Sequence, residues 1–162
     1  MDEETDPRKI MENIPWFKEL KPAHFKKLAE IASVHTFPEG SELFREGDRE
    51  DRLYVVIEGR VAIEIFVPHR GRVSILTTEP LDTIGWSSVT PTIRTRTASA
   101  RAVLPSKVIG FDSEALRKLC DEDFELGYFV MRRIANIIAG RLMVTRLQLL
   151  DMFASPPEAS HD

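Results

Sequence analysis

Three groups of residues carry side chains or backbone patterns that could support catalysis. The run Gly85-Trp86-Ser87-Ser88-Val89 begins like a nucleophile elbow, but Val89 stands where the second glycine belongs and no strand-turn-helix context is indicated. Cys120 lies in an apolar helical stretch, where a cysteine is a small core residue more often than a reactive thiol. The histidines, His24, His35, His69 and His161, lack metal-ligand spacing. We therefore expect no enzyme, no metal site and no cofactor.

Length and composition set the frame in which these residues act. The chain has 162 residues, about the size of one domain, and 43% hydrophobic residues are enough for a packed core. The 22 Lys and Arg are outnumbered by 26 Asp and Glu, so there is no basic excess to bind a phosphate backbone, and we expect no DNA partner. The single Cys120 excludes a disulfide framework.

The ends of the chain and its hydropathy bear on location. The first residues, Met1 to Asp6, are acidic and lack the basic and apolar regions of a secretory signal. No apolar run approaches the roughly 18 residues of a membrane span. We therefore expect a cytoplasmic protein that does not bind a membrane.

The apolar pattern changes twice along the chain. Residues 7–35 show three- and four-residue spacing, which predicts two short helices that start or break at Pro15 and Pro22. From His35 to Phe111 the spacing becomes two, with turn signals such as Glu58-Gly59 at regular distances. That region predicts an all-β roll or sandwich of about eight strands.

A second helical region follows the strands. Ser113 is the expected N-cap of a helix that begins near it, and a long helix is predicted over about 123–153. The final stretch of the long helix has the alternating four- and three-residue steps of a coiled-coil seam. That seam is Ile138, Leu142, Thr145, Leu149 and Met152. It predicts a homodimer, and residues 154–162 are expected to form a frayed tail.

The turn glycines and strands of this chain follow a specific order. The runs in question are Phe37-Pro38-Glu39-Gly40, Phe44-Arg45-Glu46-Gly47-Asp48, Leu53 to Val61, Ile84 to Val89 and Arg96 to Ala100. In that order they resemble the cyclic-nucleotide-binding domain, the sensor of the catabolite activator proteins and of the regulatory subunits of cAMP-dependent protein kinase. The resemblance covers roughly residues 14–153. It implies a β-roll of the jelly-roll type, a double-stranded β-helix, with N-terminal helices and a long C-terminal helix.

The resemblance also implies an anion site. Its phosphate-binding cassette would extend from Gly85 through Ser87 and Ser88, whose free backbone amides in a helical turn attract phosphate. Arg96 would close the site with a guanidinium that matches two phosphate oxygens, and Thr97 would add another donor. Alternatively, Arg96 is one more solvated arginine and the serines form a plain turn.

Two positions depart from the family pattern. Trp86 stands where the family has a glutamate that accepts a hydrogen bond from the ribose hydroxyl, and Thr95 replaces the family proline. Trp86 is either a wall that reshapes the pocket for another anionic ligand or a core anchor in a pocket that no longer binds one. A hydroxyl left without its acceptor costs about 1 to 3 kcal/mol.

The long last helix is similar to the family's C helix, which covers the ligand and pairs two subunits. On that comparison Thr145 contacts the base of the nucleotide, whereas the alternative makes it a polar residue that sets the register of the seam. Only nine residues follow Phe153, so we expect no helix-turn-helix domain.

Together these interpretations give one functional hypothesis and one alternative. We expect residues 1–13 to be a tail and helix start, and 14–153 to be a free-standing sensor of cAMP, cGMP or a related phosphorylated small molecule. It would signal through its last helix and dimer geometry to an unknown protein partner. The alternative is a structural or protein-interaction domain that has lost nucleotide binding, because Trp86 replaces the ribose acceptor.

Overall fold

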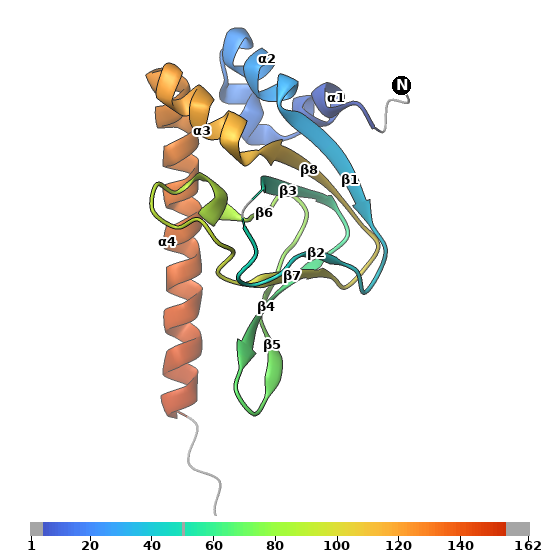
Figure 1. Cartoon of the computed structure of the whole chain (residues 1–162), viewed down its shortest axis with the longest axis vertical. Coiled ribbons are helices and arrows are strands. Elements are labelled where there is room, and N and C mark those ends of the chain that lie inside the picture. Colours follow the sequence, from blue (N-terminus) through green and yellow to red (C-terminus); the bar gives the residue numbers. More distant parts are fainter. Residues whose placement is uncertain (1–4, 50, 155–162) are drawn as a thin grey trace, which may run out of the picture.

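N-terminal helices, antiparallel strands and two C-terminal helices follow one another in the computed structural model, which describes residues 5–49 and 51–154 (Figure 1). The helical segments are α1 (Pro7–Glu12), η2 (Pro15–Glu19), α2 (Pro22–Glu30), the turn η3 (Trp86–Val89), α3 (Ser113–Glu122) and α4 (Phe124–Ala154). The strands are β1 (Ala32–Phe37), β2 (Glu42–Phe44), β3 (Arg52–Glu58), β4 (Val61–Val67), β5 (Gly71–Thr77), β6 (Thr83–Ile84), β7 (Ser99–Ala102) and β8 (Ser106–Asp112). The predicted fold class is confirmed.

The strands form two antiparallel sheets, in the orders β1-β8-β3-β6 and β2-β7-β4-β5. Successive residues of β3 face different apolar clusters because side chains alternate along a strand. Leu53 and Val55 pack with the N-terminal helices and with α3 and α4, whereas Tyr54 and Val56 pack inside the roll. The sheet that contains β3 therefore separates a helical core from a roll core, and α4 belongs to the first.

The N-terminal region differs from the expected two helices. It forms three short helical segments, and β1 already begins at Ala32. Each segment starts with a proline, namely Pro7, Pro15 and Pro22, because a proline at the first turn loses no intrahelical hydrogen bond. Trp16 of η2 stacks on Phe129 of α4 with ring centroids 5.8 Å apart, so the N-terminal segments are attached to the long helix.

The start of α3 corrects another expectation. Asp112, not Ser113, is the N-cap, since its carboxylate accepts a hydrogen bond from the Ala115 amide at 2.7 Å. Ser113 is the first helical residue and is buried. The following helix, α4, runs over Phe124–Ala154, within one residue of the expected range. Residues 155–162, expected to be frayed, lie outside the described residues.

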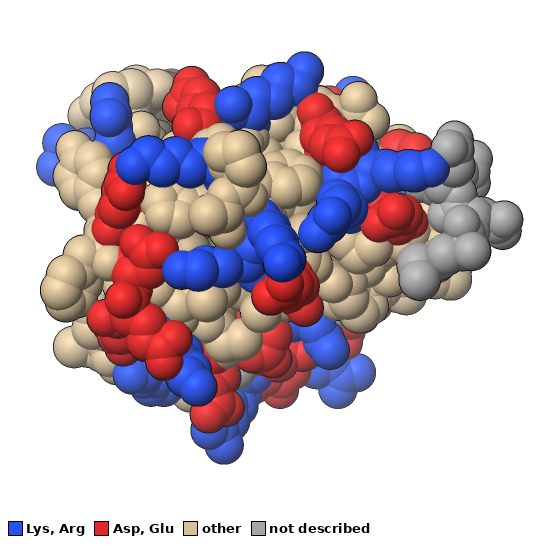
Figure 2. Space-filling model, turned by 90° about the horizontal axis from the view of Figure 1, so that it is seen from above, with Lys and Arg blue, Asp and Glu red and all other residues tan. Residues whose placement is uncertain are grey.

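The described surface carries charges of both signs. Figure 2 looks onto the end of the molecule where α2 and α3 lie, and acidic and basic side chains are interspersed across that face. No helix of the described residues has both the length and the apolar character needed to cross a membrane.

Candidate functional site

A cavity of about 200 Å³ lies between the roll and α4. Its lining residues come from β2, β4, β5, β6, η3, the segment before β7 and α4, and they are Phe44, Ile63, Ile75, Leu76, Thr83, Ile84, Gly85, Trp86, Ser87, Arg96, Thr97, Ala98, Arg141, Val144, Thr145 and Gln148. Six of the seven residues singled out from the sequence are in this set. The seventh, Ser88, is fully buried and is not among the lining residues.

Gly85 provides the turn that brings the cassette to Arg96. Its φ of +77° lies in the left-handed region, where a side chain is disfavoured. A Cβ atom at this position would overlap the Nη1 atom of Arg96 and would lie 3.1 Å from the carbonyl oxygen of Arg52. Glycine is therefore required here both by the backbone conformation and by the space that the guanidinium occupies.

Arg96 is a buried arginine, with only 2% of its surface exposed. Its Nη2 donates to the Asp51 carboxylate at 2.9 Å and to the Arg52 carbonyl at 2.7 Å, and its Nη1 lies 3.4 Å from the Gly85 carbonyl. The guanidinium carbon lies 4.1 Å above the ring of Phe44. Nε has no hydrogen-bond partner among the described residues, although it is buried. Arg96 is thus not the solvated arginine of the alternative interpretation.

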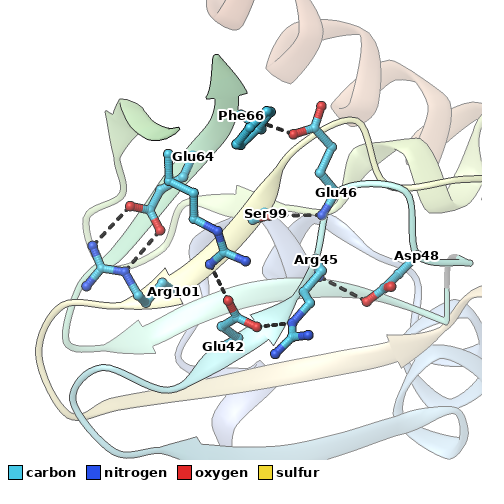
Figure 3. Close-up of polar contacts among 9 residues, drawn as sticks. Glu42, Arg45, Glu46, Asp48, Glu64, Phe66, Ser99 and Arg101 are labelled. Atoms are coloured by element: carbon cyan, nitrogen blue, oxygen red, sulfur yellow. Dashed lines mark hydrogen bonds and ion pairs between the residues drawn. The ribbon is translucent and has the colours of Figure 1, made fainter. Parts of the chain in front are cut away.

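The loop between β2 and β3 holds the backbone of Arg96. The Gly47 amide donates to the Arg96 carbonyl at 2.9 Å, and the Arg96 amide donates to the Asp48 carbonyl at 2.8 Å. The loop itself is fixed because the Arg45 amide donates to the Asp48 carboxylate and the Glu46 amide donates to Ser99 Oγ (Figure 3). The turn motif found in the sequence therefore has a role in positioning the arginine.

A neighbouring network around the sheet β2-β7-β4-β5 engages Arg45, Arg72 and Arg101. Glu42 accepts hydrogen bonds from Arg45 and Arg72, which lower the pKa of its carboxyl group. The buried Glu64 accepts from Nε and Nη2 of Arg101, both at 3.0 Å, and this raises the pKa of Arg101 (Figure 3). Arg101 is not a lining residue of the cavity.

The turn η3 differs in detail from the expected anion cradle. The Ser88 amide donates to the Gly85 carbonyl at 3.0 Å and is not free, because the turn closes on itself as a 3-10 helix. The Ser88 carbonyl accepts from Arg117 of α3, so this residue fixes the turn to the helices. Trp86 lines the cavity and also packs against the helical core.

The helix α4 contributes polar groups that the sequence analysis mostly missed. Arg141 is half-buried and donates from Nη2 to the Thr83 carbonyl at 3.3 Å, and Gln148 donates to the Ile75 carbonyl at 2.7 Å. Desolvation lowers the pKa of Arg141, opposed by the charge of Asp82. Thr145 donates to the Arg141 carbonyl at 2.9 Å and lines the cavity. The four-residue step between Arg141 and Thr145 was the signal that could have identified the arginine.

Two of the histidines and the cysteine that were considered for catalysis have environments that fit a structural role. His24 lies 3.2 Å from the Asp123 carboxylate, and His35 shares a hydrogen bond with Ser33. Burial, with help from Asp121 and Asp123, raises the pKa of Cys120 to about 11, so the thiol is not activated. Within residues 5–49 and 51–154, no His, Cys, Asp and Glu gather in a group that could hold a metal ion.

Comparison with known proteins relates this geometry to a family. Residues 34–123 match the family model of the cyclic nucleotide-binding domain. A CRP-like cAMP-activated global transcriptional regulator of Mycobacterium tuberculosis is 31% identical over 84% of this chain and 58% of the regulator, so this chain spans little more than half of that relative.

Solved structures agree with the family match. A protein of Geobacter metallireducens, named provisionally as cyclic nucleotide-binding, is 28% identical, with a TM-score of 0.71 over 84% of this chain and 97% of its own. A cyclic nucleotide-binding domain of Methylobacillus flagellatus has a TM-score of 0.75 at 23% identity, covering 95% of this chain and 85% of its own, which is a likeness of fold alone.

Proposed function

The chain belongs to the cyclic nucleotide-binding domain family, and from this premise we propose that it is a ligand-sensing regulatory module whose α4 cavity binds cAMP, cGMP or a related phosphorylated small molecule. The observation that carries the proposal is the buried Arg96 in the cavity wall, with an Nε atom that has no partner among the described residues. A buried donor without a partner costs free energy that an anionic ligand would recover.

The phosphate of the ligand is held by Arg96, and Ser87 and Thr97 line the same cavity. Charge-assisted hydrogen bonds from a guanidinium to phosphate are among the stronger polar contacts in proteins. Trp86 presents an aromatic surface to the ligand, and Thr145 of α4 meets its far end. The protein is not an enzyme on this proposal, and the ligand is a signal, not a cofactor.

Signal output passes through α4. This helix contacts the ligand cavity with one side and exposes many large apolar residues elsewhere, including Leu142 and Leu149. Exposed apolar side chains on a long helix are stabilised by pairing, so the module is a homodimer through α4 that presents its state to a protein partner in the cytoplasm.

A second candidate function rests on Trp86. Its indole packs against the helical core, as expected if the tryptophan had filled the ribose end of a former nucleotide site. The domain would then serve as a structural or interaction module.

A thermal-shift screen separates the two candidates. We expect cAMP, cGMP or their 5′-monophosphates to raise the Tm by about 5 to 10 °C at 100 times Kd. Arg96→Gln should abolish this shift, measured against its own ligand-free Tm. Arg94→Gln is the matched control, because Arg94 is exposed and does not line the cavity. If no nucleotide shifts the wild type, the interaction module is the better account.

A further inference from the structure

A groove of about 440 Å³ lies between α3, the N-terminal end of α4 and the segment that follows η3. It shares no lining residue with the ligand cavity, and most of its lining is apolar, including Val89, Cys120, Phe124, Gly127, Tyr128 and Met131. Gly127 lets the two helices approach closely, because a Cβ atom there would lie 2.6 Å from the Cys120 carbonyl oxygen. Phe124 and Tyr128 are 83% and 68% exposed, so this α3–α4 groove has large aromatic walls that the described residues leave uncovered.

The exposed residues of the groove continue the seam of α4 toward the start of the helix. Counting back from Ile138 in alternating steps of three and four gives Ala135, Met131, Tyr128 and Phe124, all of them exposed. Together with the seam they occupy every a and d position from the first residue of α4 to Met152. A helix that keeps this spacing over about four heptads presents one stripe to one partner along its whole length.

The rim of the groove carries charges of both signs. Arg94, in the segment after η3, and Asp121, near the end of α3, both line the groove and are exposed. Neither has an ion-pair partner among the described residues, whereas the other lining arginine, Arg117, donates to the Ser88 carbonyl. In a two-fold contact, any residue that meets a second residue is met in return by the copy of that pair. A surface with one free charge of each sign is therefore complementary to a copy of itself.

The area available in the groove also favours a second copy. Two Phe124 and two Tyr128 side chains would bury roughly 600 Å² on pairing, given the size and exposure of these rings. A stable interface buries about 1,200 Å² or more. A short segment that filled only the groove would fall below this area, whereas a second copy also covers the exposed Leu142, Leu149 and Met152 of the seam.

From these observations we infer that the α3–α4 groove is a self-association surface that receives Phe124 and Tyr128 of a second copy, with Arg94 of each protomer facing Asp121 of the other. The inference rests on the homodimer of the proposed function and extends its interface to the N-terminal end of α4. The two α4 helices then run parallel, because Phe124 and Tyr128 of both copies meet at the same end.

Sedimentation velocity of the full chain over a range of concentrations tests the inference. Phe124→Glu with Tyr128→Glu should raise the dimer Kd by about a hundredfold or more, because charges would be buried in an apolar contact. Arg94→Asp should raise it about tenfold, since two like-charge contacts replace two attractive ones. Arg94→Asp with Asp121→Arg should return it to within about threefold of the wild type. Arg8→Asp is the matched control, because Arg8 is exposed in α1 and does not line the groove.

The outcomes distinguish this inference from the proposed function. If Phe124→Glu with Tyr128→Glu leaves the dimer Kd unchanged while Leu142→Glu with Leu149→Glu dissociates the dimer, the inference is overturned and the α4 homodimer stands. A double charge reversal that fails to restore the dimer also overturns the inference. A monomeric wild type overturns the inference and the homodimer together and leaves the groove to a different occupant. Circular dichroism melts verify the fold of each variant, and nucleotide binding is a separate measurement because none of the altered residues lines the ligand cavity.

Discussion

Arg96 and Gly85 depend on each other for their conformations. The guanidinium occupies the space where any other residue at position 85 would place its Cβ atom, and its Nη1 lies near the carbonyl of the same glycine. The site is thus built from a backbone turn and a side chain that arrive from different parts of the roll. A change at either residue should alter the other.

Gly85→Ala should therefore abolish nucleotide binding as well as destabilise the fold. The left-handed backbone alone costs about 1 to 2 kcal/mol with an alanine. Gly40→Ala is the matched control, because Gly40 also has positive φ, at +84°, but a Cβ there meets nothing within 4 Å. Urea unfolding should give similar losses for the backbone part, whereas calorimetry should show lost binding only in Gly85→Ala. Retained binding in Gly85→Ala would refute the coupling to Arg96.

Trp86→Glu should improve cAMP binding. The new carboxylate would accept a hydrogen bond from the ribose 2′-hydroxyl, a gain of about 1 to 3 kcal/mol, reduced by the cavity left by the indole. The 2′-deoxy analogue should not share the gain, and titration of both proteins with both ligands completes the cycle. Equal improvement for the two ligands would mean that Trp86 only blocks the pocket.

At the scale of residues, the sequence predicted those parts of the site that belong to short sequence motifs. Gly85, Ser87 and Arg96 belong to motifs with fixed spacing, and they meet in one cavity. The contact of Arg141 with the Thr83 carbonyl was missed because the two residues are 58 positions apart in the chain, and only the four-residue step from Arg141 to Thr145 pointed to the arginine. The Ser88 amide was assigned wrongly, because the tight turn uses it internally.

At the scale of elements, the junction between α3 and α4 is the point where the helical parts meet. Asp123 accepts a hydrogen bond from Lys27 of α2 at 2.8 Å and another from the Leu126 amide at 3.2 Å. The contact with Lys27, followed by that with Leu126, lowers the pKa of Asp123 to about 2. One carboxylate thus links α2 to the start of the ligand-covering helix.

Asp123→Asn should lower the stability at neutral pH, because the amide keeps the shape but loses the charge. A folded-state pKa below the unfolded value of 3.8 means that the carboxylate stabilises the fold above pH 4. This contribution should be lost as the pH falls from about 4 to about 2. Urea midpoints of wild type and variant should differ at pH 7 and converge near pH 2. A constant difference across this range would argue against the ion pair.

Most helices and strands were predictable from the sequence, and the exceptions have physical causes. Long periodic stretches identified α4 and the longer strands. The strands β2 and β6, of three and two residues, are too short to show alternation in the sequence. Asp112 rather than Ser113 became the cap because both residue types favour that position, and β8 continues to Asp112.

At the scale of the whole molecule, α4 lies along one side, with α3 at its upper end and the roll beside its lower part in the view of Figure 1, and it exposes many large apolar residues. The residues of the expected seam lie in three environments. Ile138 packs against the helical core and Thr145 lines the cavity, whereas Leu142, Leu149 and Met152 are exposed. The exposed part therefore adjoins the ligand cavity, and a second copy seated there would cover both.

Leu142→Glu combined with Leu149→Glu should dissociate the proposed dimer, because two charges would be buried at its seam. Sedimentation velocity should change from dimer to monomer. Phe66→Glu with Leu104→Glu is the matched control, since both residues are exposed apolar positions on the roll, and its sedimentation should equal that of the wild type. A wild-type dimer that survives the first pair would place the interface elsewhere.

The side-chain Nε–Hε resonance of Arg96 in ¹⁵N-labelled protein tests the central claim most directly, since this buried group has no partner among the described residues. The peak is assigned by its loss in Arg96→Gln. On addition of AMP or cAMP, the account predicts a saturable shift of this peak, whereas the Arg101 peak, already paired with Glu64, stays in place. An Arg96 peak that does not move at millimolar concentrations of either nucleotide would contradict a phosphate site in the α4 cavity.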